Sequence, residues 1–107
     1  MSDHENIVLD KSYRFAIRIV KMYQHLSSEK KEYVFSKQVL RSGTSTGENA
    51  EEAVGGISKA DFRAKMSIAY KKARETEYWL RLLHNTGCSC IDYNRPQRII
   101  ENFVFDY

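Results

Sequence analysis

Proline is nearly absent from this chain, and its scarcity limits the possible folds more than any other feature. A single proline, Pro96, occurs in 107 residues, whereas average usage of about 5% would give roughly five. Because proline and glycine mark turns, a chain with one proline and five glycines has few of them. A β-sandwich or barrel needs a turn about every 8–12 residues. The sequence therefore favours long helices.

Two adjacent apolar stripes predict a first helix over about residues 6–26. The first stripe contains Leu9, Tyr13, Ala16, Val20 and Tyr23. The second stripe contains Val8, Phe15, Ile19, Met22 and Leu26. Spacings of three and four residues place each stripe on one helical face. Together they form a wide arc, which indicates contact with more than one neighbouring helix.

A second helix is predicted over about residues 30–54, despite an unfavourable centre. Its apolar face contains Phe35, Val39, Gly43, Thr46, Ala50 and Ala53. Residues 43–47 (GTSTG) have low helix propensity, but the face resumes in phase after them, so we predict one continuous helix. The small residues Gly43, Gly47 and Ala50 would let another backbone approach closely, and we assign them a helix-packing role.

The remainder predicts a long third helix and a short fourth one. Gly55 and Gly56 end the second helix, Ser58 caps the third, and Gly87 stops it. The apolar face of the third helix contains Phe62, Met66, Ala69, Ala73, Thr76, Leu80 and Leu83. Asn94 and Pro96 begin the fourth helix, whose face contains Ile99, Ile100, Phe103 and Val104. We therefore predict one all-α domain over residues 1–107, an antiparallel up-and-down four-helix bundle.

Motifs for catalysis and metal binding are missing from the sequence. Neither His25 nor His84 follows a glutamate by three residues, as a di-iron bundle requires. Cys88 and Cys90 are too few and too close for a zinc site, and no nucleophile elbow or phosphate loop occurs. We predict a non-enzymatic protein with no cofactor and no metal. A metal-dependent enzyme is a third hypothesis, which an elemental assay would test.

The cellular compartment is predicted from the apolar runs, the N-terminal residues and the cysteines. No run approaches the roughly 18 apolar residues of a membrane span, and the acidic start of the chain does not resemble a signal peptide. Cys88 and Cys90 are too close for an ordinary disulfide. We expect a cytoplasmic protein with reduced thiols and no membrane partner.

Basic residues form rows on two predicted helices, although the net charge is only +3. No acid occurs between residues 11 and 28, or between residues 62 and 74. Such rows can contact a phosphate backbone. The alternative is that they form a solvated face without a ligand, which we favour if the protein is a monomer. A symmetric oligomer would repeat the rows and so favour binding. The candidate nucleic-acid-binding residues are Lys11, Arg14, Arg18, Lys21, Arg63, Lys65, Lys72, Arg74 and Arg81.

Two further groups of side chains have more than one interpretation. Tyr70, Tyr78 and Trp79 lie beside the apolar face of the third helix. They can stack on bases, but packing against a helix or a subunit is the more common role of such residues. Arg41, Glu48 and Glu52 on the second helix are suited to ion pairs with the basic rows, which is a structural role.

Three ordered motifs resemble a bacterial family of four-helix-bundle proteins. They are residues 41–53 (RSGTSTGENAEEA), 58–62 (SKADF) and 72–83 (KARETEYWLRLL). The family includes proteins encoded in intervening sequences of 23S rRNA genes and the accessory variability determinant of diversity-generating retroelements. Thr46 and Ala50 stand where the family usually has larger aliphatic residues, and its fourth helix is usually longer.

The resemblance implies a ring-like homopentamer without catalytic residues. Retroelement members of the family are associated with nucleic acid and with a reverse transcriptase through basic surfaces. Our leading hypothesis is therefore a homo-oligomeric bundle that binds RNA or DNA through its basic faces. The alternative is a scaffold that contacts only protein, either itself or a polymerase-like partner.

Overall fold

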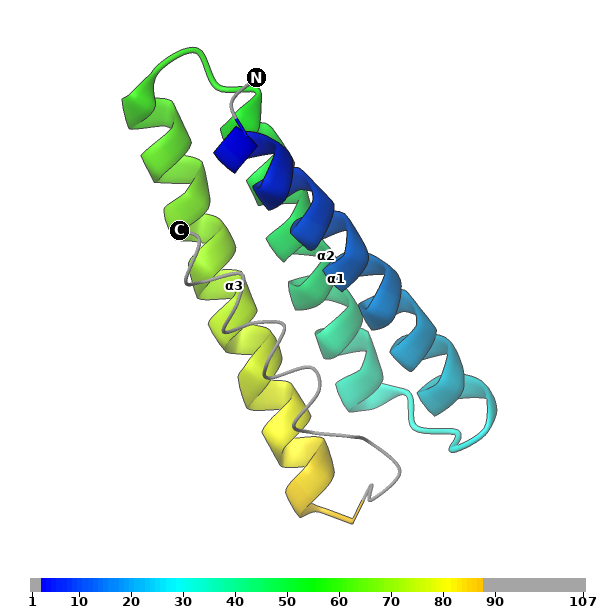
Figure 1. Cartoon of the computed structure of the whole chain (residues 1–107). Coiled ribbons are helices and arrows are strands. Elements are labelled where there is room, and N and C mark those ends of the chain that lie inside the picture. Colours follow the sequence, from blue (N-terminus) through cyan, green and yellow to red (C-terminus); the bar gives the residue numbers. More distant parts are fainter. Residues whose placement is uncertain (1–2, 88–107) are drawn as a thin grey trace.

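The computed structural model describes residues 3–87, with side chains from residue 6 onward. These residues form three helices and no strand: α1 (Asp3–Ser28), α2 (Val34–Val54) and α3 (Lys59–Asn85). Consecutive helices run in opposite directions, and α2 packs against both of the others (Figure 1). No pair of Cα atoms from α1 and α3 lies within 8 Å. The all-α prediction is confirmed, whereas the predicted fourth helix lies outside the described residues.

The start of α2 differs from the prediction, because the helix begins at Val34 and not near Lys30. Lys31 adopts a left-handed conformation with φ of 52°, which is incompatible with a continuing α-helix after α1. The Glu32 carboxylate then accepts hydrogen bonds from the backbone N–H groups of Val34, Phe35 and Ser36 at 2.7–3.1 Å. These donors have no partner within the helix, so the glutamate fixes the first turn.

The boundary between α2 and α3 follows the predicted signals. Gly55 is the residue that caps the end of α2. The Ser58 hydroxyl accepts a hydrogen bond from the Asp61 N–H at 3.1 Å and caps the start of α3. At the other end, Gly87 adopts a positive φ of 107° two residues after the last helical residue. The predicted caps and stop are confirmed.

The core consists of two apolar clusters, one toward each end of the helices. The larger cluster contains Phe15, Ile19, Leu26, Val39, Ala73, Leu80 and Leu83. The smaller cluster contains Val8, Ala50, Ala53, Met66 and Ala69. Of the two stripes predicted on α1, the one with Phe15 and Ile19 is in the core, whereas Tyr13 and Val20 of the other remain exposed. Between the clusters, the buried positions of α2 are Ser42, Gly43, Thr46 and Gly47.

Helices α1 and α2 approach closely where these small residues lie. A Cβ atom added to Gly43 would lie 2.6 Å from both γ carbons of Ile19. One added to Gly47 would lie 3.2 Å from the backbone oxygen of Ser12. Ala50 is fully buried one turn further along. Glycine therefore costs helix propensity here, but it allows the two backbones to meet.

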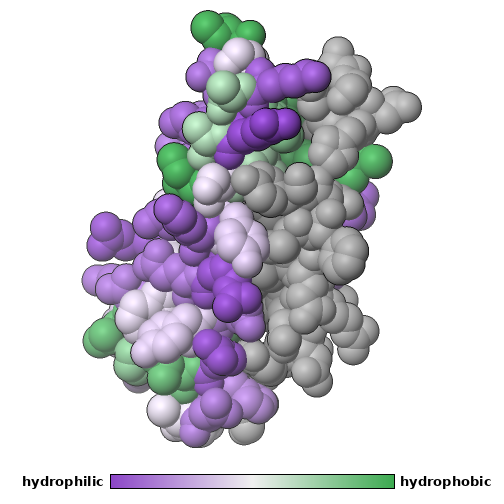
Figure 2. Space-filling view, turned by 90° about the vertical axis from the view of Figure 1, so that its left-hand side faces the viewer, coloured by the Kyte–Doolittle hydropathy of each residue, from purple (hydrophilic) through white to green (hydrophobic). Residues whose placement is uncertain are grey.

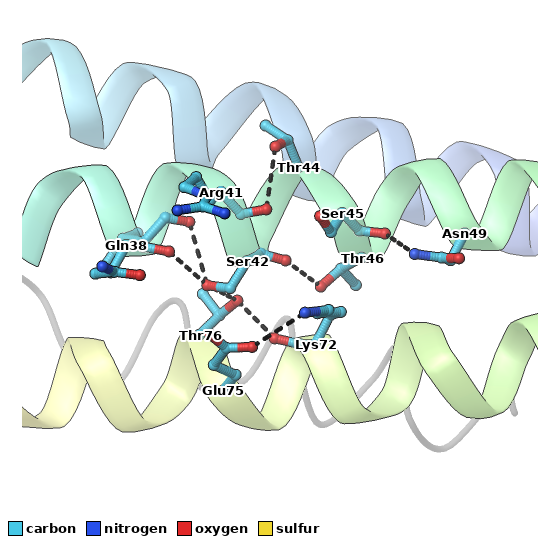
Figure 3. Close-up of polar contacts among 11 residues, drawn as sticks. Gln38, Arg41, Ser42, Thr44, Ser45, Thr46, Asn49, Lys72, Glu75 and Thr76 are labelled. Atoms are coloured by element: carbon cyan, nitrogen blue, oxygen red, sulfur yellow. Dashed lines mark hydrogen bonds and ion pairs between the residues drawn. The ribbon is translucent and has the colours of Figure 1, made fainter.

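Hydroxyl groups occupy the remaining buried positions without being left unpaired. The buried polar residues are Ser12, Ser36, Ser42, Thr46 and Thr76. Each hydroxyl lies within hydrogen-bonding distance of a carbonyl three or four residues earlier in the chain. The hydroxyls of Ser42 and Thr76 also lie 2.8 Å apart and join α2 to α3 (Figure 3). Pairing of this kind removes most of the cost of burying a hydroxyl.

The contact at Gly43 predicts that Gly43→Ala destabilises the protein. Ile19 is branched and fully buried, so the new methyl group forces the two helices apart. Overpacking costs about 1–3 kcal/mol, whereas alanine regains about 1 kcal/mol of helix propensity. We expect a net loss of up to about 2 kcal/mol in the free energy of unfolding, measured by urea denaturation.

Gly55→Ala is the matched control. Its new Cβ would lie 3.7 Å from the nearest atom, the Glu51 carbonyl oxygen, which is an ordinary contact. This variant should keep or slightly raise the stability. Equal stability of the two variants would contradict the close α1–α2 contact.

Candidate nucleic-acid interface

The basic row of α1 faces solvent along most of its length. Arg18 and Lys21 are exposed, and Lys11 is half-buried. The Nε atom of Arg14 lies 3.2 Å from a carboxylate oxygen of Asp10, four residues earlier in the helix. This pair is largely exposed, and such pairs contribute little to stability. Arg18 and Lys21 are therefore available to a ligand, and Arg14 is shared between Asp10 and solvent.

The basic residues of α3 divide into two groups with different surroundings. Arg63, Arg74 and Arg81 are all exposed. Lys65 and Lys72 lie on the other flank and are each half-buried. The two groups therefore face different environments on the same helix.

Lys65 and Lys72 are both engaged by carboxylates. The Nζ atom of Lys65 lies 2.7 Å from a carboxylate oxygen of Glu52, which reaches it from α2. The Nζ atom of Lys72 lies 3.5 Å from a carboxylate oxygen of Glu75 in the same helix (Figure 3). The first contact confirms the expected ion pair between Glu52 and a basic row. Both lysines therefore already have a carboxylate partner, which weakens their assignment as ligand contacts.

The Glu52 pair also shifts the pKa of Lys65. The hydrogen bond that Lys65 donates to Glu52 and the negative charge of Glu52, together with the charge of Glu48, raise the pKa of Lys65 above its ordinary value. A raised pKa in the folded state stabilises the fold below the unfolded-state pKa, and this contribution is lost as the pH rises through the folded-state pKa. Because both side chains are about half exposed, the pair adds little to stability.

Five of the nine candidate nucleic-acid-binding residues are exposed and have no ion pair within residues 3–87. They are Arg18, Lys21, Arg63, Arg74 and Arg81. They lie on α1 and α3, the two helices whose backbones do not come within 8 Å of each other. The structure therefore presents two separate basic faces on one subunit. On the side of α3, hydrophilic side chains cover much of the coloured surface, with hydrophobic patches between them (Figure 2).

An exposed apolar stripe on α1 lies beside its basic row. Tyr13, Ile17 and Val20 are 62%, 40% and 37% exposed, and their spacing places them on one helical face. Tyr13 and Val20 belong to the predicted wide arc, but sequence alone does not separate the stripe that is buried from the one that is not. Ile17 lies outside both predicted stripes, although its spacing of four residues from Tyr13 and three from Val20 places it on the same face.

The three aromatic residues predicted beside the apolar face of α3 have different positions. Trp79 is partly buried and packs against Phe35 of α2, with ring centroids 5.9 Å apart. Tyr70 is half-buried. Tyr78 is 49% exposed. Trp79 therefore has the predicted packing role against a neighbouring helix, whereas the ring of Tyr78 is partly exposed to solvent.

The described part of the chain contains neither a cluster of metal ligands nor a helix suited to a membrane. No group of three or more histidine, cysteine, aspartate or glutamate residues between residues 3 and 87 is placed to hold a metal ion. Cys88 and Cys90 lie outside this range. None of α1, α2 and α3 combines the length and the apolar character that crossing a membrane requires.

The fold and its surface define a class: a helical protein with closely packed helices and basic outer faces. Residues 4–100 match the 23S rRNA-intervening sequence protein family, and the chain belongs to that family. A crystal structure of a protein of unknown function from the S23 ribosomal protein family of Bacteroides thetaiotaomicron VPI-5482 is similar to it. The two chains are 48% identical with a TM-score of 0.82, over 96% of this chain and 90% of the other. None of the curated proteins compared matches the chain.

Proposed function

We propose that this protein is a non-enzymatic, homo-oligomeric helical bundle that binds RNA or DNA through the basic faces of α1 and α3. The observation that carries the proposal is the set of exposed cations without ion pairs, which includes Arg18 and Arg74. The name of the family links its members to intervening sequences of 23S rRNA, which supports RNA as the ligand. A nucleic-acid ligand also supports a cytoplasmic location.

Binding would depend on charge and not on base sequence. Each lysine or arginine that contacts a phosphate releases condensed counterions, so the affinity falls steeply as salt increases. Arginine also forms two parallel hydrogen bonds with a phosphate. A subunit with two separate basic faces can contact two strands, or two parts of one folded strand.

The α1 face is tested by the double variant Arg14→Glu/Arg18→Glu. It reverses two charges at exposed positions, so we expect a loss of at least tenfold in affinity for a structured RNA at about 0.1 M salt, and a shallower salt dependence. Filter binding or fluorescence anisotropy over a salt series measures both quantities.

Lys37→Glu/Arg41→Glu is the control for the change in charge. Both residues are exposed on α2, so the net charge changes equally while the α1 face is kept. This control should lose much less affinity than the α1 variant. Unchanged RNA binding by the α1 variant, or an equal loss in the two variants, would contradict the proposed face.

The oligomer is supported by the exposed apolar stripe of Tyr13, Ile17 and Val20. A stripe of this kind on a soluble domain is typical of a surface that a partner covers, and homo-oligomers are the most common assemblies. We propose that a second copy covers it, in a ring-like pentamer. Arg14, Arg18 and Lys21 each follow one residue of the stripe, so assembly would bring basic rows from several subunits together.

Ile17→Asp tests this assembly. A charge in the centre of the stripe should dissociate the oligomer to monomers, since burying an unpaired carboxylate is costly. Light scattering coupled to gel filtration measures the mass, and circular dichroism checks the helix content. Ile57→Asp, at a 96% exposed loop position, is the control and should leave the mass unchanged. A monomeric wild type, or an Ile17→Asp variant of unchanged mass, would refute the interface.

The fold proposal includes a short fourth helix that begins at Asn94 and completes an antiparallel bundle. It is supported by the family match, which continues to residue 100, and by the structural relative, which covers 96% of the chain. Backbone chemical shifts of residues 95–104 test it. Helical values are expected, and random-coil values would contradict it.

A protein-only scaffold is the second candidate function, and the apolar stripe of α1 is the observation that favours it. In this case the stripe contacts another copy or a polymerase-like protein such as a reverse transcriptase. The scaffold predicts a stable oligomer and no salt-sensitive retention of nucleic acid. The salt series described above therefore separates the two functions.

A further inference from the structure

The outer face of α3 places an exposed aromatic ring within its basic row. Arg74, Tyr78 and Arg81 follow each other at spacings of four and three residues, and Lys71 lies seven residues before Tyr78. These spacings put the four side chains on one side of the helix, and all four are exposed. We call this group the α3 outer face.

Neighbouring rings hold Tyr78 in place. Its ring meets that of Trp79 edge to face, with centroids 5.4 Å apart. Trp79 is itself partly buried against Phe35. An exposed tyrosine supported in this way has lost part of its rotational freedom already, so less entropy is lost when a ligand contacts it.

The charges around the α3 outer face favour an anion. Lys71, Arg74 and Arg81 form no ion pair within residues 3–87. Of the two nearby acids, Glu75 is engaged by Lys72 at 3.5 Å. The other, Glu77, is half-buried on the adjacent side of the helix and pairs with neither arginine. The face therefore has more positive than negative charge.

We propose that the α3 outer face binds single-stranded nucleic acid, with a base stacked on Tyr78 and phosphates contacted by Arg74 and Arg81. The inference rests on the proposed nucleic-acid function and gives it a substrate class. The two arginines are about 10 Å apart along the helix axis, with the ring between them. Cations that follow the backbone and an aromatic ring that takes a base are the two parts of a single-strand site. A duplex buries the faces of its bases, so it offers phosphates but nothing to stack on Tyr78.

Tyr78→Ala separates stacking from charge. Fluorescence anisotropy is measured with labelled 20-nucleotide oligo-U, oligo-dT and a 20-base-pair duplex at fixed salt. Loss of one stacked base should weaken single-strand binding by about 5- to 150-fold and leave duplex binding unchanged. Tyr78→Phe should restore the affinity, because it keeps the ring. Tyr78→Leu keeps the apolar bulk without the ring and should behave like Tyr78→Ala, which guards against an effect of misfolding.

Tyr33→Ala, at another exposed tyrosine, is the control and should change neither affinity. A loss for Tyr78→Ala in the oligo-U or the oligo-dT titration supports the site, and the tighter of the two identifies the strand type. Equal losses for single strand and duplex, no loss, or a change of oligomeric mass would overturn it. The last result would assign Tyr78 to a protein contact. If wild type binds no nucleic acid, the proposed function fails as well; if only the Tyr78 effect is missing, this inference alone fails.

Discussion

The close contact between α1 and α2 is the constraint on which the other features of the structure depend. The branched side chain of Ile19 lies over Gly43, where any Cβ atom would collide with it. Helix α2 also packs against α3, so it has a neighbour on two sides. The side chains at its buried positions must therefore be small or compact. The hydroxyls of Ser42 and Thr46 meet this requirement, since they satisfy their hydrogen bonds within the helix or across to α3. The glycines thus fix the distance between α1 and α2, and the hydroxyl pair links α2 to α3.

This packing determines which surfaces remain for function. With α2 between its two neighbours, α1 and α3 each direct one face away from the core, and both faces carry cations. On α1 the basic row adjoins the exposed stripe around Ile17, so the proposed assembly and the proposed ligand site share one helix. On α3 the basic row lies on both sides of Tyr78 along the helix. This row and the buried face of α3 are on different sides of the helix. The two outer helices therefore have different roles in the proposed assembly and the proposed binding of nucleic acid.

The sequence predicted the fold well where apolar periodicity alone determines which residues are buried. The buried face of α3 from Met66 to Leu83 was predicted residue by residue, because its apolar spacing is uninterrupted. The start of α2 was predicted wrongly, since Lys31 is not a residue that usually marks a left-handed turn and Glu32 caps with its side chain. Burial of Ser36 and Ser42 was missed because polar residues normally indicate surface. Among the candidate site residues, Lys65 was expected to bind ligand, but a carboxylate from another helix engages it. The sequence suggested Glu52 as a partner for the basic rows, but no pattern within one helix shows which lysine it would reach.

The central claim is that the basic outer faces bind nucleic acid while the side of α2 between them does not. Amide hydrogen exchange with and without a structured RNA containing single-stranded loops tests it most directly, because it reports every helix in one experiment. We predict slower exchange on α1 around Arg18 and on α3 around Tyr78, with α2 around Glu48 unchanged at low salt and all differences lost at high salt. Protection centred on α2, or no change in any helix, would contradict the account.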